Sequence, residues 1–192
     1  KRDWSSDVCS SDLVDGRYLV YGTSKGGTGQ RDIWVLPMFG DRKAFPFVQT
    51  PFEEFSPSLS PDSRWMAYTT NGSGRHQVVV QSFPDPSQAK YPISIEGGSE
   101  PRWRRDGKEL YYVAPDKKFM AVTIKGDREL TVGSPVSLFE TTMPFPSPGT
   151  TPARRYYDVT ADGQRFLIDS PRVQTNSSPI TVILNWTAGL RK

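Results

Sequence analysis

The segment Phe55-Ser56-Pro57-Ser58-Leu59-Ser60-Pro61-Asp62-Ser63-Arg64-Trp65-Met66-Ala67-Tyr68 reads as two short strands joined by a Ser-Pro-Asp-Ser turn. Pro61 restricts φ to a value that suits the turn, and the side chains of Asp62 and Ser63 can bond to the nearby backbone. The residues after the turn are aromatic and apolar, which favours a pleated, half-buried strand. This segment therefore predicts a β-hairpin.

The same hairpin turn occurs four times along the chain, each time around an aspartate. These residues are Asp15, Asp62, Asp106 and Asp162, which lie 47, 44 and 56 residues apart. A repeat period in the forties indicates an array of similar units, each too small to bury its own apolar face.

Further strand-like segments follow each hairpin. A third strand is predicted at residues 32–36, 77–82, 119–124 and 180–186, and a fourth at 44–48, 90–95 and 135–139. About four short antiparallel strands in about 45 residues are typical of a β-propeller blade. We therefore expect an all-β fold, a β-propeller fragment of about four blades with partial first and last blades. The blades are expected at residues 14–48, 49–95, 96–139 and 153–192, with a Pro-rich insertion at 141–152.

Composition supports many short strands joined by turns. The chain has 192 residues, of which 35% are hydrophobic and 12% aromatic, with 16 glycines and 17 prolines. No run of 18 apolar residues is present, so the sequence predicts no membrane segment. The net charge is +3. Because the basic residues are dispersed, no nucleic-acid partner is expected.

The first 13 residues are expected to be non-native. Residues 7–13, Asp-Val-Cys-Ser-Ser-Asp-Leu, can be back-translated onto the end of a common sequencing adapter. The only cysteine, Cys9, lies in this segment, so disulfide and thiol chemistry cannot be inferred from it.

The repeat resembles the WD40-like (PD40) repeat of TolB-type β-propellers. The resemblance rests on Ser60-Pro61-Asp62-Ser63-Arg64 before an aromatic strand, on Asp32-Ile33-Trp34-Val35-Leu36, and on Pro101-Arg102-Trp103-Arg104-Arg105-Asp106-Gly107. Ser63 departs from the family's usual glycine, and Arg104 and Arg105 replace its usual Ser and Pro. The resemblance implies a propeller that covers nearly all of the chain from Val14 onward.

The end of the chain, Pro179-Ile180-Thr181-Val182-Ile183-Leu184-Asn185-Trp186-Thr187-Ala188-Gly189-Leu190, resembles the C-terminus of propellers attached to bacterial serine/threonine protein kinases. This resemblance implies a kinase domain upstream, none of whose motifs lies in these residues. For such a parent protein, a periplasmic or extracytoplasmic position is expected, with a cytoplasmic one as the alternative.

Charged and aromatic residues precede three of the predicted innermost strands. They are Glu53, Glu54, Phe55, Glu100, Arg154, Arg155 and Tyr156. Since innermost strands line the channel of a propeller, we expect these residues at one mouth of that channel. Converging polar and aromatic groups suit a protein or peptide partner, or a small ligand. A solvated rim is the competing interpretation.

No catalytic or metal-binding group is expected. His76 is the only histidine and lies in a polar loop, so an exposed turn residue is the favoured interpretation over a general base. One histidine without cysteine partners has no recognised zinc-ligand spacing, and no cofactor is predicted. The Pro-rich insertion is interpreted either as a binding arm across one face or as a loop without fixed conformation.

These observations favour a non-catalytic β-propeller module for protein or ligand binding, at the C-terminal end of a bacterial serine/threonine kinase. Two alternatives remain. One is the propeller domain of a prolyl-oligopeptidase-like hydrolase, and the other is a free TolB-like periplasmic scaffold.

Overall fold

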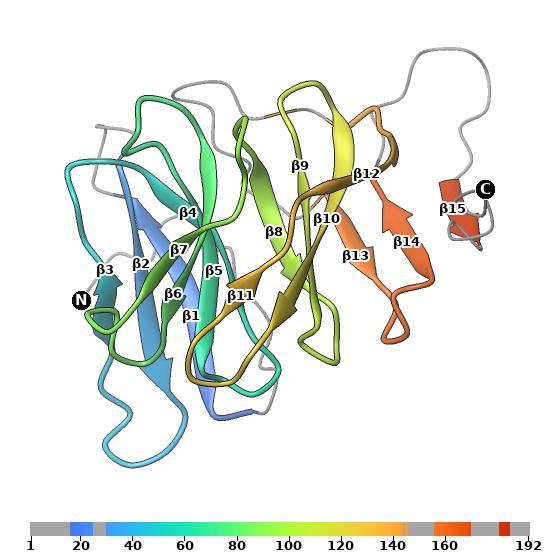
Figure 1. Ribbon diagram of the computed structural model, residues 1–192. Coiled ribbons are helices and arrows are strands. Elements are labelled where there is room, and N and C mark those ends of the chain that lie inside the picture. The colour runs from blue at the N-terminus through green and yellow to red at the C-terminus, as the bar shows by residue number, and fades with distance from the viewer. Residues whose placement is uncertain (1–15, 25–29, 144, 146–155, 170–180, 185–192) are drawn as a thin grey trace.

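The computed structural model describes residues 16–24, 30–143, 145, 156–169 and 181–184. These residues form four antiparallel sheets and no helix, which confirms the predicted all-β propeller fold. Figure 1 shows the sheets side by side in chain order, from blue through green and yellow to orange. No helix among these residues could span a membrane. The expectation for residues 1–13 lies outside the described part.

The first two sheets differ by one strand. The first sheet contains β1 (Tyr18–Ser24), β2 (Arg31–Pro37) and β3 (Phe45–Val48), in that order. The second contains β4 (Glu54–Leu59), β5 (Trp65–Thr70), β6 (Gln77–Ser82) and β7 (Lys90–Pro92). The first sheet has no innermost strand within the described residues, and the residues before Gly16 lie outside them. Strand β7 stops at Pro92 rather than at residue 95.

The third sheet has a divided outer edge. It contains β8 (Ser99–Trp103), β9 (Glu109–Val113), β10 (Lys118–Lys125), β11 (Thr131–Val132) and β12 (Val136–Glu140). Both β11 and β12 pair with β10, so two short strands share the place of the single fourth strand that the sequence predicts. The fourth sheet contains β13 (Tyr157–Val159), β14 (Arg165–Ile168) and β15 (Thr181–Leu184).

The aspartate turns are built by local hydrogen bonds. In the second sheet, the Ser60 hydroxyl donates to Asp62 Oδ1 at 2.6 Å, and Arg64 N donates to the same oxygen at 3.1 Å. In the third sheet Arg104 takes the place of the hydroxyl, because its Nε donates to Asp106 Oδ1 at 2.7 Å. Ser63 adopts φ = 57°, where the equivalent position in the other turns is glycine at φ = 70–74°.

Apolar side chains fill the three interfaces between neighbouring sheets. Val20, Ile33 and Val35 of the first sheet meet Leu59, Met66, Tyr68 and Val79 of the second. Trp65, Ala67, Val78 and Val80 of the second meet Trp103, Leu110, Tyr112 and Val122 of the third. Tyr111, Val113 and Phe119 of the third meet Tyr157, Phe166 and Ile168 of the fourth. The two middle sheets are therefore buried on both faces, which positions the inner strands rigidly.

Polar side chains join the inner strands across these interfaces. The Trp103 indole Nε1 donates to the carbonyl of Ser58 at 3.1 Å. The buried Tyr157 hydroxyl donates to two carbonyls. It lies 2.7 Å from the carbonyl oxygen of Glu100 and 3.1 Å from that of Tyr111. A buried donor shared by two carbonyls is costly to remove, since both acceptors lose a partner.

We predict that Tyr157→Phe lowers the free energy of unfolding by about 1–3 kcal/mol, the usual cost of leaving buried groups unsatisfied. Urea titration monitored by tryptophan fluorescence measures this change. Tyr112→Phe is the matched control, because Tyr112 is equally buried but its hydroxyl makes no hydrogen bond within the described residues. Equal losses in the two variants would show that the Tyr157 hydroxyl does not join the third and fourth sheets.

Candidate functional site

Four of the predicted site residues gather at one end of the inner strands. At this end the loops lead into β4 and β8, and we call it the loop end. The aspartate turns lie at the opposite ends of these strands, which we call the turn end. Glu53, Glu54, Phe55 and Glu100 are all buried, with exposed fractions of 7%, 1%, 2% and 3%. The interpretation of a solvated rim is therefore wrong for these four. Tyr156 is partly buried, and Arg154 and Arg155 lie outside the described residues.

Three of these residues, Glu54, Phe55 and Glu100, lie inside the inner strands, whereas the sequence predicts them just before those strands. Strand β4 begins at Glu54 and β8 at Ser99, because pairing continues past a bulge in each strand. The bulges contain Ser56 at φ = 50° and Glu100 at φ = 59°, each followed by a proline. Non-glycine residues held at positive φ cost on the order of 1–3 kcal/mol each and often occur at binding sites.

The two bulges contact each other across the interface between the second and third sheets. The Ser56 hydroxyl donates to Glu100 Oε1 at 2.6 Å. Glu100 N donates to Thr69 Oγ1 at 3.3 Å, and its carbonyl accepts from Tyr157. Glu100 thus connects the inner strands of three sheets, and its carboxylate is held in place before any ligand arrives.

Glu54 lies on the other side of β4, near Asp32 of the first sheet. Its Oε1 accepts hydrogen bonds from the Thr50 hydroxyl at 2.5 Å and from the Thr70 hydroxyl at 3.4 Å. Its Oε2 is buried and accepts no hydrogen bond from the described residues. Burial raises the pKa of Glu54, the Thr50 hydrogen bond lowers it, and the charge of Asp32 raises it again, with a net increase.

We predict that Glu54→Gln stabilises the protein at pH 7 by about 1 kcal/mol, because an uncharged amide replaces a buried carboxylate. The raised pKa means that Glu54 favours the folded state most when protonated. The contribution of protonated Glu54 to the stability of the parent protein is complete below the ordinary pKa of 4.5 and is lost as pH rises through the folded-state pKa. The extra stability of the Glu54→Gln variant over the parent should therefore disappear below pH 4.5.

Urea midpoints of the two proteins at pH 4 and pH 7 measure this difference. Glu96→Gln is the control for the same chemical substitution at a side chain that is 86% exposed. A Glu54→Gln variant that is less stable than the parent at pH 7 would contradict the argument.

His76 is buried, so the prediction of an exposed turn residue is wrong. Its exposed fraction is 6%, and its Nε2 lies 3.6 Å from Glu53 Oε2. Asn71 also binds Glu53, with its Nδ2 donating to Oε2 at 3.3 Å and its Oδ1 accepting from Glu53 N at 2.9 Å. The sequence contains no direct sign of this pair, because Glu53 and His76 belong to different loops of the second sheet.

Two aromatic rings surround His76. The Phe55 ring lies 5.2 Å from the imidazole in an edge-to-face arrangement, and the Phe145 ring lies at 6.1 Å, tilted by 44°. In the described part of the chain, no serine or threonine hydroxyl bonds to the imidazole. Nor do the described residues contain a group of three His, Cys, Asp or Glu side chains suited to a metal ion.

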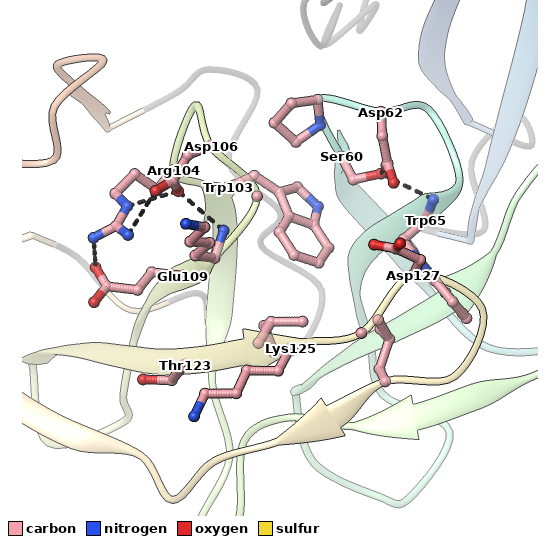
Figure 2. A pocket seen from close by; sticks show the side chains of 16 residues that line it. Ser60, Asp62, Trp65, Trp103, Arg104, Asp106, Glu109, Thr123, Lys125 and Asp127 are labelled. Carbon is pink, nitrogen blue, oxygen red and sulfur yellow. Dashed lines mark hydrogen bonds and ion pairs between the residues drawn. The ribbon is translucent and has the colours of Figure 1, made fainter.

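A hollow at the turn end was not predicted. It lies between the second and third sheets, has a volume of about 660 Å³, and includes Trp65 and Trp103 among its lining residues. Figure 2 shows Arg104 beside it, bonded to both Asp106 and Glu109. The hydrogen bonds from Arg104 lower the pKa of Asp106. These three charges satisfy one another, so they contribute to the turn and are not free to bind a ligand.

A second hollow of about 540 Å³ adjoins the first and shares Trp65 and Asp127 with it. Trp65 Nε1 is buried and makes no hydrogen bond with the described residues. The tryptophans on either side of the aspartate turns are the sequence feature that could have indicated these hollows. Neither hollow includes any of the seven predicted site residues.

Comparison with known proteins identifies similar folds. No family model matches the sequence, and no curated protein matches it. Among solved structures, TolB from Acinetobacter baumannii is 14% identical with a TM-score of 0.61, over 90% of this chain and 39% of that one. A putative TolB from Agrobacterium tumefaciens is 14% identical with a TM-score of 0.58, over 86% of this chain and 54% of that one.

A peptidase also has a similar structure. The puromycin-hydrolyzing peptidase of Mycobacterium tuberculosis is 19% identical with a TM-score of 0.52, over 79% of this chain and 25% of that one. The chain thus spans little more than half, or less, of the length of these proteins. Likeness at such low identity identifies the fold and leaves the activity open.

Proposed function

We propose that this chain, which has a TolB-like β-propeller fold, is a non-catalytic module that binds a protein or peptide at its loop end. The observation that carries the proposal is the pair of strained bulges at Ser56 and Glu100, bonded to each other where the inner strands begin. Rigid polar groups at a strand end suit recognition, because they lose little conformational entropy on binding.

Two further groups at the loop end support this proposal. Glu54 Oε2 and Ser99 Oγ are buried and make no hydrogen bond with the described residues. Buried polar groups are nearly always satisfied in folded proteins, by ordered water where no protein group is near, so these two atoms mark the loop end as a polar environment. The same end holds the buried His76–Glu53 pair, and among the described residues no serine or threonine hydroxyl bonds to its imidazole as a nucleophile would.

The proposal extends to the parent protein. The resemblance of residues 179–190 to kinase-linked propellers supports a place at the C-terminal end of a bacterial serine/threonine kinase. The likeness to a peptidase keeps the propeller of a prolyl-oligopeptidase-like hydrolase as an alternative, and the likeness to TolB keeps a free periplasmic scaffold. The gene sequence upstream of this chain distinguishes these three interpretations. A kinase catalytic loop would support the kinase, a nucleophile elbow the hydrolase, and a signal peptide the free scaffold.

We predict that peptides selected from a phage-displayed random library on this chain bind at the loop end. Arg154→Ala combined with Arg155→Ala should weaken the selected peptides about tenfold, by removing two charges that shortly precede β13 in the sequence. Isothermal titration calorimetry measures the affinities.

Arg128→Ala is the control, because Arg128 is exposed beside the second hollow at the turn end. If the selected peptides lose affinity on Arg128→Ala and keep it on the double substitution, the binding surface lies at the turn end and the proposal is wrong.

A further inference from the structure

The Pro-rich insertion brings one aromatic ring from the third sheet to the second. Thr141 follows β12, and its N donates to the carbonyl of Lys117 at 2.9 Å. Met143, with an exposed fraction of 1%, is buried in the interface between the third and fourth sheets. Phe145, two residues later, contacts both that interface and the ring of His76 in the loop between β5 and β6.

The surroundings of His76 form a preorganised site for this ring. The imidazole nitrogen edge is directed at the Glu53 carboxylate, and the ring also contacts Phe55. The His76 carbonyl accepts a hydrogen bond from Gly98 N at 2.9 Å, which ties its loop to the third sheet. Ring centroids 4.5–7 Å apart are in the range of favourable aromatic pairs. Among the described residues, Phe145 is the second ring within this range of the His76 imidazole, after Phe55.

We propose that Glu53, Phe55 and His76 form an aromatic seat for a phenylalanine carried by an extended, proline-flanked peptide of a partner protein, and that Phe145 occupies this seat in the free chain. This inference deepens the proposed binding function and rests on it. The partner chemistry follows from the occupant, since Phe145 lies between Pro144 and Pro146 in the sequence. Proline on both sides favours extended backbone, which reduces the entropy lost on binding.

Phe145 is a replaceable occupant. Its ring is only partly buried, whereas Met143 two residues earlier is fully buried. Met143 can thus hold the insertion in place while Phe145 leaves the seat. An internal segment competes at an effective concentration in the millimolar range, so an added peptide should bind weakly until Phe145 is removed.

The test uses a fluorescein-labelled synthetic peptide with the sequence of residues 141–148, Thr-Thr-Met-Pro-Phe-Pro-Ser-Pro. Fluorescence anisotropy measures its binding to the parent chain and to the Phe145→Ala variant. We expect the variant to bind at least tenfold more tightly than the parent. A peptide with alanine in place of its phenylalanine should bind neither protein.

Two controls keep the result decisive. His76→Ala added to Phe145→Ala should abolish binding, and circular dichroism establishes whether that double variant folds. If that double variant does not fold, the test rests on the Phe145→Ala variant alone, by comparing the peptide that contains phenylalanine with the one that contains alanine. Equal binding of both peptides, or binding of neither, overturns the aromatic seat. The Arg154 and Arg155 experiment uses other peptides and residues, so the expected weakening of the selected peptides there would leave the proposed function standing even where the aromatic seat fails.

Discussion

Each sheet of this protein buries its apolar faces only against its neighbours. All six residues of β5 are buried, and they alternate between two interfaces. Met66 and Tyr68 face the first sheet, while Trp65 and Ala67 face the third. A sheet of four short strands cannot exclude water from both faces by itself, so its stability depends on the interfaces on either side.

This dependence explains the order found at the loop end. The inner strands approach one another because apolar side chains pack between the neighbouring sheets. Polar side chains at their beginnings are then forced into contact, as Ser56 and Glu100 are. Buried polar groups of this kind are worth retaining only when they are well bonded or serve recognition, since apolar replacements are often as stable. The strained backbone of these two bulges is the reason for placing the proposed binding surface at the loop end. At the turn-end hollow, Arg104, Asp106 and Glu109 satisfy one another.

Much of the fold could be predicted from local features of the sequence. The aspartate turns and the alternation of apolar residues act over a few positions, and they located β6 at residues 77–82 without error. Errors arose where pairing depends on a partner strand. The bulges extend β4 and β8 backwards, and the outer edge of β10 is divided between β11 and β12. Neither event has a strong local determinant beyond a single proline or glycine.

The candidate site was predicted only in part. Glu53, Glu54, Phe55 and Glu100 do gather at one end, because equivalent positions of a repeat occupy equivalent places in space. Their burial, and that of His76, could not be predicted, because it depends on contacts with neighbouring sheets that are distant in the sequence.

The sequence by itself determined the repeat, the turns and the strand type, since turn chemistry and side-chain alternation are properties of neighbouring residues. Only the tertiary structure decided that His76 meets Glu53, Phe55 and Phe145. These residues lie up to 92 positions apart in the printed sequence, and only the stacking of the sheets brings them together.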